Sequence, residues 1–313
     1  MTATAEPSPA PSPIPQRQDE EDLVELRAAA RLTHNQADAT RLNRTIGTIG
    51  LAVLAPAFTL LLPGAALYLA VAAALWLIVA RTYLKRREKS LRAKATAYQE
   101  LYDTQLFDLP WDTVLAGDRQ AVQREIDAAA PRPRVDRDYK WYENVPAVPW
   151  PVDALSCQAQ NLLWGRRNHQ GYARFLTGLL IALIALAVLQ GYLMDLSLTA
   201  FALQLFAPLV PAFLDLAELP QAHRAARKNK NELEHTIQAL IRSHVTGHPA
   251  TRDDCRNVQD KIFELRNNDP TVPTWFHTIR RSATSHQNTQ AMEDLKTTVN
   301  ALPRPRSPQD QDT

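Results

Sequence analysis

Residues 45–80 form an uninterrupted stretch without a single charged side chain. As one helix rising about 1.5 Å per residue, this stretch would be roughly 54 Å long, nearly twice the roughly 30 Å hydrocarbon core of a bilayer. Pro63 and Gly64 lie near its middle, where proline removes a backbone donor and glycine tolerates the dihedrals of a tight turn. The stretch therefore predicts a transmembrane helical hairpin with spans at 45–62 and 65–80.

A second apolar stretch occurs downstream. Residues 175–194 are long enough for one span, and residues 196–214 follow after a short break at Asp195. Pro208 and Pro211 lie in the last span and predict a kinked or locally unwound helix there. An apolar helix can also be buried in a soluble core, but one chain of this size rarely buries two such hairpins. We therefore expect a mainly α integral membrane protein with two transmembrane helical hairpins, or four spans.

The average composition does not indicate these spans. Charged residues make up 22% of the chain, and the mean hydropathy is −0.28. Basic residues flank both hairpins, whereas the turns inside the hairpins contain no Lys or Arg. The flanking residues are Arg41, Arg44, Arg81, Lys85, Arg86, Arg87, Lys89, Arg166, Arg167, Arg174, Arg224, Arg227, Lys228 and Lys230. By the positive-inside rule, we expect both termini and the segment between the hairpins to face the cytoplasm.

The segments outside the spans are expected to be helical, apart from the two tails and a Pro-rich middle. The expected organisation is a disordered Pro-rich tail at 1–16, a cytoplasmic helix at 17–44, the first hairpin at 45–83, a basic cytoplasmic helix at 84–105, a Trp/Pro-rich cytoplasmic segment at 106–166, the second hairpin at 174–216, a C-terminal cytoplasmic helical region at 217–300 and a disordered tail at 301–313. Within the C-terminal region, Asp253 and Asp254 predict a helix N-terminus.

Small and polar residues in the spans indicate how the helices pack. These positions are Gly47, Gly50, Ala66, Ala70, Ala74, Gln190 and Gln204. Small residues let helices approach closely, and the glutamines either hydrogen-bond between helices or line a pore. No charge lies in the middle of a span, which argues against an ion-coupled transporter. Four short spans with so few polar groups cannot enclose an aqueous channel in one subunit, so a pore would require a homo-oligomer.

Signals of catalysis are sparse. The chain contains no GxGxxG, no Walker-type loop and no GxSxG. His244 and His248 have the spacing of metal ligands on a helix, but the surrounding Gly and Pro predict a turn and no third ligand lies nearby. Cys157 and Cys255 are expected to be free thiols in a reducing compartment. We therefore expect no enzymatic activity, no metal and no cofactor.

Four motifs follow one another along the chain: LFDLPWDTVLAG at 106–117, KWYENVPAVP at 140–149, CQAQNLLW at 157–164 and VQDKIFELRNNDPTVPTWFHTIRR at 258–281. In these motifs and in the order of its hairpins, the chain resembles the SMODS-associated four-transmembrane family of pore-forming effectors. The resemblance implies a place in bacterial anti-phage systems of the CBASS type. In these systems a nucleotidyltransferase makes a cyclic oligonucleotide messenger, and an effector responds by damaging the inner membrane.

A cyclic oligonucleotide offers phosphates and flat bases, so its site should combine Arg or Lys with aromatic faces. Two sets of residues offer this pairing. The first set is Trp141, Tyr142, Trp164, Arg166 and Arg167, and the second is Trp275, Phe276, Arg280 and Arg281. Alternatively, the aromatic residues anchor a small core and the arginines of the first set face lipid headgroups.

The resulting hypothesis is a ligand-gated membrane effector. The messenger binds the cytoplasmic segments, subunits assemble or rearrange, and the spans open a leak in the bacterial inner membrane. Its expected partners are the messenger, the lipid membrane and further copies of the chain, with no DNA. An alternative is a membrane-tethered scaffold or sensor without pore activity.

Overall fold

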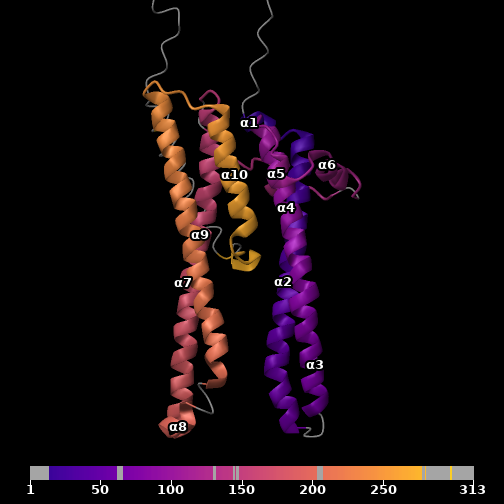
Figure 1. The fold of residues 1–313 in the computed structure, drawn as a ribbon, viewed down its shortest axis with the longest axis vertical. Helices are drawn as coiled ribbons and strands as arrows, with labels where there is room; N and C mark the ends of the chain where they lie inside the picture. The colour runs from indigo at the N-terminus through magenta and orange to yellow at the C-terminus, as the bar shows by residue number, and fades with distance from the viewer. Residues whose placement is uncertain are drawn as a thin grey trace, which may run out of the picture. The chain divides into compact units, whose positions relative to one another are not determined.

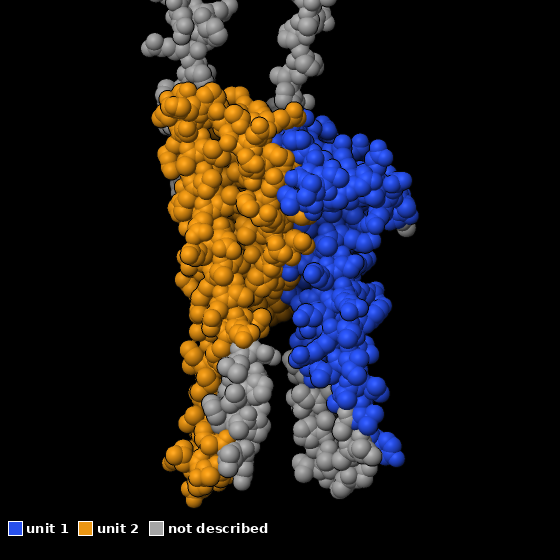
Figure 2. Space-filling model, viewed as in Figure 1, with its two compact units in different colours: residues 1–145 blue, residues 146–313 orange. Residues whose placement is uncertain are grey.

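The computed structural model describes residues 14–61, 66–129, 132–143, 145, 148–202, 207–276, 279 and 297. In these residues the secondary structure is helical and contains no strand, which confirms the expectation of a mainly α protein. The chain divides into two compact units, residues 1–145 and 146–313 (Figure 2). Of the tails predicted at 1–16 and 301–313, residues 1–13 and 301–313 lie outside the described residues, whereas residues 14–16 belong to the helix Ile14–Arg17.

The first unit is built on a long helical hairpin (Figure 1). Its helices are α1 Ile14–Arg17, α2 Glu21–Leu61, α3 Ala66–Val79, the π-helical turn Ala80–Leu84, α4 Lys85–Leu106, α5 Thr113–Ala116, α6 Arg119–Asp127 and the 3-10 turn Asp136–Asp138. Helix α2 packs against α3, the π-helical turn and α4 as the chain returns. The border predicted between a cytoplasmic segment at 17–44 and a membrane span at 45–62 thus falls within one helix, α2.

The core of the first unit lies between the N-terminal half of α2 and the C-terminal half of α4. Leu23, Val24 and Leu26 on α2 are buried, as are Leu101 and Tyr102 on α4. By contrast, the first turns of α4 are largely exposed. Burial of these apolar side chains stabilises this end of the hairpin, because each buried Leu or Val contributes about 1.5–3 kcal/mol.

The second unit contains another long hairpin and a shorter helix. Its helices are α7 Val152–Leu193, α8 Leu198–Ala200, α9 Ala207–Val245 and α10 Arg252–Asn268. Helix α10 packs on both α7 and α9 (Figure 1). It begins with a capping box in which Thr251 Oγ1 accepts the Asp254 N–H at 3.1 Å and Asp254 accepts the Thr251 N–H at 2.8 Å. The helix N-terminus predicted from Asp253 and Asp254 is therefore confirmed.

Helix α7 is long and apolar enough to cross a membrane, and it is one such helix among the described residues. Only 17% of its most apolar window is buried within the protein, and Ile181, Leu186 and Val188 are 63%, 58% and 56% exposed. A core helix of a soluble protein buries such side chains, so lipid is the medium that fits this surface. Parts of the other three predicted spans lie outside the described residues, at 62–65 and 203–206.

The small residues predicted to pack the spans have different surroundings. A Cβ on Gly47 would overlap the ring of Trp76, whose Nε1–H donates to Thr48 Oγ1 at 3.2 Å, so α2 and α3 approach closely there. Ala74 is exposed. The side chains of Ala66 and Ala70 and the packing around Gly50 are outside the description, as is Gln204.

The structure also describes Gln190 and the helix that contains the prolines of the second hairpin. Gln190 is exposed, and its amide nitrogen lies 3.9 Å from Met194 Sδ on the same turn of helix. Pro208 and Pro211 both lie in α9, and residues 203–206 before this helix are outside the described residues.

Candidate functional site

The first predicted set of ligand residues is divided between the two units. Trp141 and Tyr142 belong to the first unit, whereas Trp164, Arg166 and Arg167 lie on α7 in the second. The structure therefore describes these five residues as two separate groups, one in each unit.

In the first unit, Trp141 and Tyr142 are both engaged within the protein. Tyr142 is buried, its hydroxyl donates to Asp103 at 3.0 Å, and its ring lies 5.6 Å from that of Phe107. The guanidinium of Arg27 lies 3.4 Å from the ring centroid of Trp141. Tyr142 is thus a core residue, and an arginine of the same unit already covers one face of Trp141.

In the second unit, Arg166 on α7 faces α9. It donates to Asn231 Oδ1 at 2.6 Å and lies 3.3 Å from a carboxylate oxygen of Glu234. Burial raises the pKa of Glu234 above its usual range, against the opposing effect of Arg166. Burial lowers the pKa of Arg167, and the neighbouring Arg166 lowers it further. Arg166 is therefore an interhelical contact, while Trp164 beside it is half-buried.

The second predicted set begins in the segment after α10. Phe276 is buried, with its ring 5.1 Å from Tyr172 and 5.8 Å from Phe175, and Trp275 is 45% exposed with its ring 5.7 Å from Phe175. These aromatic contacts attach the segment to α7 at the start of the predicted third span. Arg280 and Arg281 lie outside the described residues.

A buried polar cluster, which sequence reasoning did not single out, joins α7, α9 and the end of α10. It consists of His169, His223, Lys230 and Asp269. The Nδ1 atoms of the two histidines lie 2.8 Å apart, so one ring donates its proton and the accepting ring is neutral. Lys230 forms an ion pair with Asp269, whose carboxylate also lies 4.0 Å from His169 Nε2.

The histidines considered as metal ligands are separated by the end of a helix. Helix α9 ends at Val245, before His248, and His244 Nδ1 accepts the Ala250 N–H at 3.1 Å. Among the residues that the structure describes, no group of three or more His, Cys, Asp or Glu is placed to hold a metal ion.

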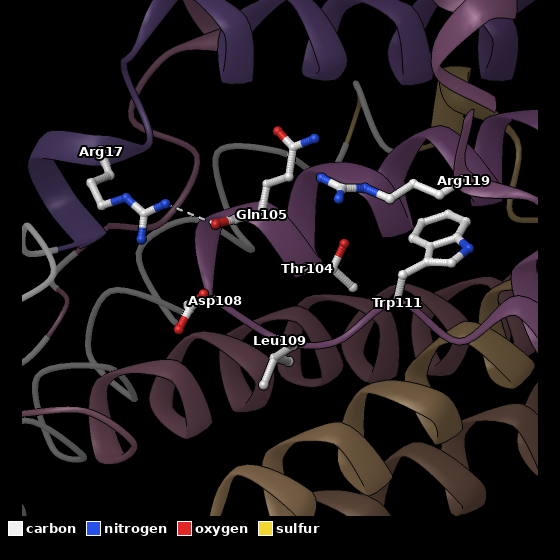
Figure 3. Close-up of a pocket in the computed structure, with 7 residues that line it drawn as sticks. All are labelled: Arg17, Thr104, Gln105, Asp108, Leu109, Trp111 and Arg119. Atoms are coloured by element: carbon white, nitrogen blue, oxygen red, sulfur yellow. Dashed lines mark hydrogen bonds between the residues drawn. The ribbon is translucent and has the colours of Figure 1, made fainter. Parts of the chain in front are cut away.

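A cavity of about 340 Å³ lies at the C-terminal end of α4 (Figure 3). Its lining residues are Arg17, Thr104, Gln105, Asp108, Leu109, Trp111 and Arg119. Sequence reasoning missed this combination of arginines and an aromatic ring, although Asp108, Leu109 and Trp111 all belong to the motif LFDLPWDTVLAG. Arg119 is eight positions after Trp111 and comes close to it only in the fold, so the two do not form a pair of sequence neighbours.

Comparisons with known proteins agree with the four motifs. The chain is 22% identical over 280 residues, covering 85% of this chain and 92% of the relative, to a protein of Bacillus cereus (strain VD146) described as a probable CBASS effector molecule. No solved structure matches the chain. Residues 12–295 match the model of the SMODS-associating 4TM effector domain, so the chain belongs to this family of four-transmembrane effectors.

Proposed function

We propose that this protein is the membrane effector of a CBASS-type anti-phage system, activated by a cyclic oligonucleotide to open a leak in the bacterial inner membrane. The family and the name of the Bacillus cereus relative support the defence role. The proposal includes four spans, with both termini in the cytoplasm and only the two short turns on the outer side. It involves no catalytic step by the effector itself.

The observation that carries the proposal is the exposed apolar surface of α7. Its apolar part, about 20 residues from Phe175, matches one bilayer crossing at about 1.5 Å per residue. The preceding part of the same helix is buried against α9 and α10 through residues such as Leu155, Cys157 and Gln158. One rigid element therefore belongs to both the cytoplasmic domain and the membrane, so a change at one end is transmitted to the other.

A leak requires several copies of the chain. The apolar faces of α7 lack the polar groups that would line water inside one subunit, so the pore forms between subunits. For the messenger to drive this change, it must bind the open assembly more tightly than the closed one.

The test is dye release from liposomes that contain the purified full-length protein, with a panel of cyclic di- and trinucleotides. We expect release with one messenger, none without it, and none from protein-free liposomes. Protease protection would show whether the protein is inserted in the vesicles. If it is inserted and no messenger in the panel causes dye release, the proposed pore is contradicted. If such vesicles still bound a messenger, the protein would instead be a membrane-tethered sensor.

A further inference from the structure

We propose that the cavity at the C-terminal end of α4 binds the nucleotide messenger, with phosphate at Arg17 and Arg119 and a base stacked on Trp111. This inference rests on the proposed function, because it assigns the site at which that messenger acts. The cavity volume of about 340 Å³ lies in the range of small-molecule sites, roughly 300–1,000 Å³.

The two arginines extend into the cavity from opposite sides (Figure 3). Arg17 donates to the main-chain oxygens of Gln105 at 2.8 Å and Leu106 at 3.2 Å. Neutral carbonyls are its partners among the described residues, so its charge is oriented but not neutralised by a carboxylate. An oriented guanidinium loses little side-chain entropy when it binds a phosphate.

Arg119 is available for a ligand. It is exposed, and its side chain makes no hydrogen bond or ion pair with any residue that the structure describes. It is the first residue of α6, where Asp118 already caps the helix by accepting the Gln120 N–H at 3.0 Å. The backbone that carries Arg119 is thus held in place, while the guanidinium remains unpaired in the cavity.

Trp111 provides a fixed aromatic surface beside Arg119. Its Nε1–H donates to the Gly117 carbonyl at 2.7 Å, which closes a loop over the short helix α5 and holds the ring at the cavity. The ring is half-buried, and it has no aromatic or cation–π partner among the described residues. A base stacking on a tryptophan contributes about 1–3 kcal/mol, and the stacking tolerates any base.

Asp108 and Gln105 distinguish a nucleotide from a simple anion. Asp108 places a carboxylate at the same cavity, which opposes binding of an inorganic anion but accepts the N–H groups of a base. Gln105 offers a half-buried amide that can both donate and accept. Two cations, one carboxylate, one amide and one aromatic ring together suit a ligand that carries phosphate and a base.

The test measures binding of each cyclic nucleotide in the panel to the full-length protein in detergent, by calorimetry. We expect Arg119→Gln and Trp111→Leu each to weaken binding of the active messenger about 10-fold or more, because each removes one ligand contact. Arg124→Gln is the matched control, since Arg124 is an exposed arginine on α6 that does not line the cavity. We expect the control to bind like the wild type.

Two results would overturn the assignment in different ways. Wild-type affinity in both Arg119→Gln and Trp111→Leu would show that the messenger binds elsewhere, while leaving the proposed function intact. Inorganic pyrophosphate that competes as strongly as the messenger itself would show that the cavity recognises charge alone. If the inserted wild-type protein binds no nucleotide in the panel, the proposed function itself fails.

Discussion

At the scale of single residues, the buried ion pair between Lys230 and Asp269 gives a prediction about stability. Both residues are buried, with side chains 9% and 10% exposed, so removing one charge leaves the other in a poorly solvated position. We expect Asp269→Asn to lower the free energy of unfolding by about 3–5 kcal/mol. The measurement is the thermal unfolding midpoint of the full-length protein in detergent.

The control for this prediction is Glu264→Gln on α10. Glu264 pairs with Lys261 at 2.8 Å, but both side chains are substantially exposed, so its loss should leave the midpoint unchanged. Equal midpoints for Asp269→Asn and the wild type would show that the buried pair makes no net contribution. The two variants together separate the effect of burial from that of charge.

Because of the buried thiol of Cys255, we expect the free energy of unfolding to fall as the pH rises above 9. Burial, with smaller effects from Asp254 and Asp153, raises the pKa of Cys255 from 9.0 to about 12. Because the folded state holds the proton more tightly, this stabilisation is fully present below pH 9 and is lost as the pH rises toward 12. Within this window the loss is at most about 1.4 kcal/mol per pH unit.

Comparing the unfolding midpoint of Cys255→Ala with that of the wild type across this window tests the prediction. The wild type should lose stability more steeply with rising pH. Val258→Ala, another buried truncation on α10, should lower the midpoint at every pH without changing its slope. Parallel curves for Cys255→Ala and the wild type would contradict a raised pKa.

Individual residues also show what the sequence could not predict. Tyr142 and Phe276 were identified as aromatic neighbours of arginine, with a role in a small core as the alternative, and the fold shows that both are buried. Trp111 and Arg119 were not paired, because the loop around α5 brings them together. Adjacency in the sequence is a poor guide to a site built from loop residues, since turns decide which side chains converge.

At the scale of elements, the close approach of α2 and α3 at Gly47 gives a further prediction. A Cβ there would overlap the ring of Trp76, and an indole held by its hydrogen bond to Thr48 cannot move aside cheaply. We expect Gly47→Leu to destabilise the hairpin by about 1–3 kcal/mol, measured as a lower unfolding midpoint. Gly178→Leu on α7 is the control, because a Cβ at Gly178 meets nothing within 4 Å. Equal midpoints for the two variants would contradict this packing.

Helix type was predictable from the sequence, but helix boundaries were not. The predicted border between cytoplasm and membrane at 44 and 45 falls inside α2, and α7 continues without interruption from Val152 to Leu193. Hydropathy indicates which part of a helix suits lipid and which suits water. It does not indicate where the helix ends, because backbone hydrogen bonds can continue from one medium into the other. The start of α10 could be predicted from the sequence, because a helix cap depends on residues within a few positions of one another.

At the scale of the whole molecule, the two units share a plan. In each, a helical hairpin has a packed core at one end and an apolar stretch at the other. The order of motifs was sufficient to predict the family, which the match over residues 12–295 establishes. The cavity at α4 could not be predicted in this way, because its residues come from α1, α4, the following loop and α6.

The four-span arrangement predicts which parts of the chain are reachable from outside the cell. Thr199 is exposed on α8, in the connection between α7 and α9, and should lie on the outer side. Ala121 is exposed on α6 and should lie in the cytoplasm. A membrane-impermeant maleimide should therefore label Thr199→Cys in intact spheroplasts and Ala121→Cys only after permeabilisation.

The natural thiols make this experiment possible in the full chain. Cys157 and Cys255 are both buried, and the raised pKa of Cys255 keeps it in the unreactive thiol form, so the unmodified protein should label poorly on either side. Labelling of Thr199→Cys only after permeabilisation would contradict the outer position of this turn. Labelling of Ala121→Cys in intact spheroplasts would place the cavity on the outer face, where a messenger made in the cytoplasm could not reach it.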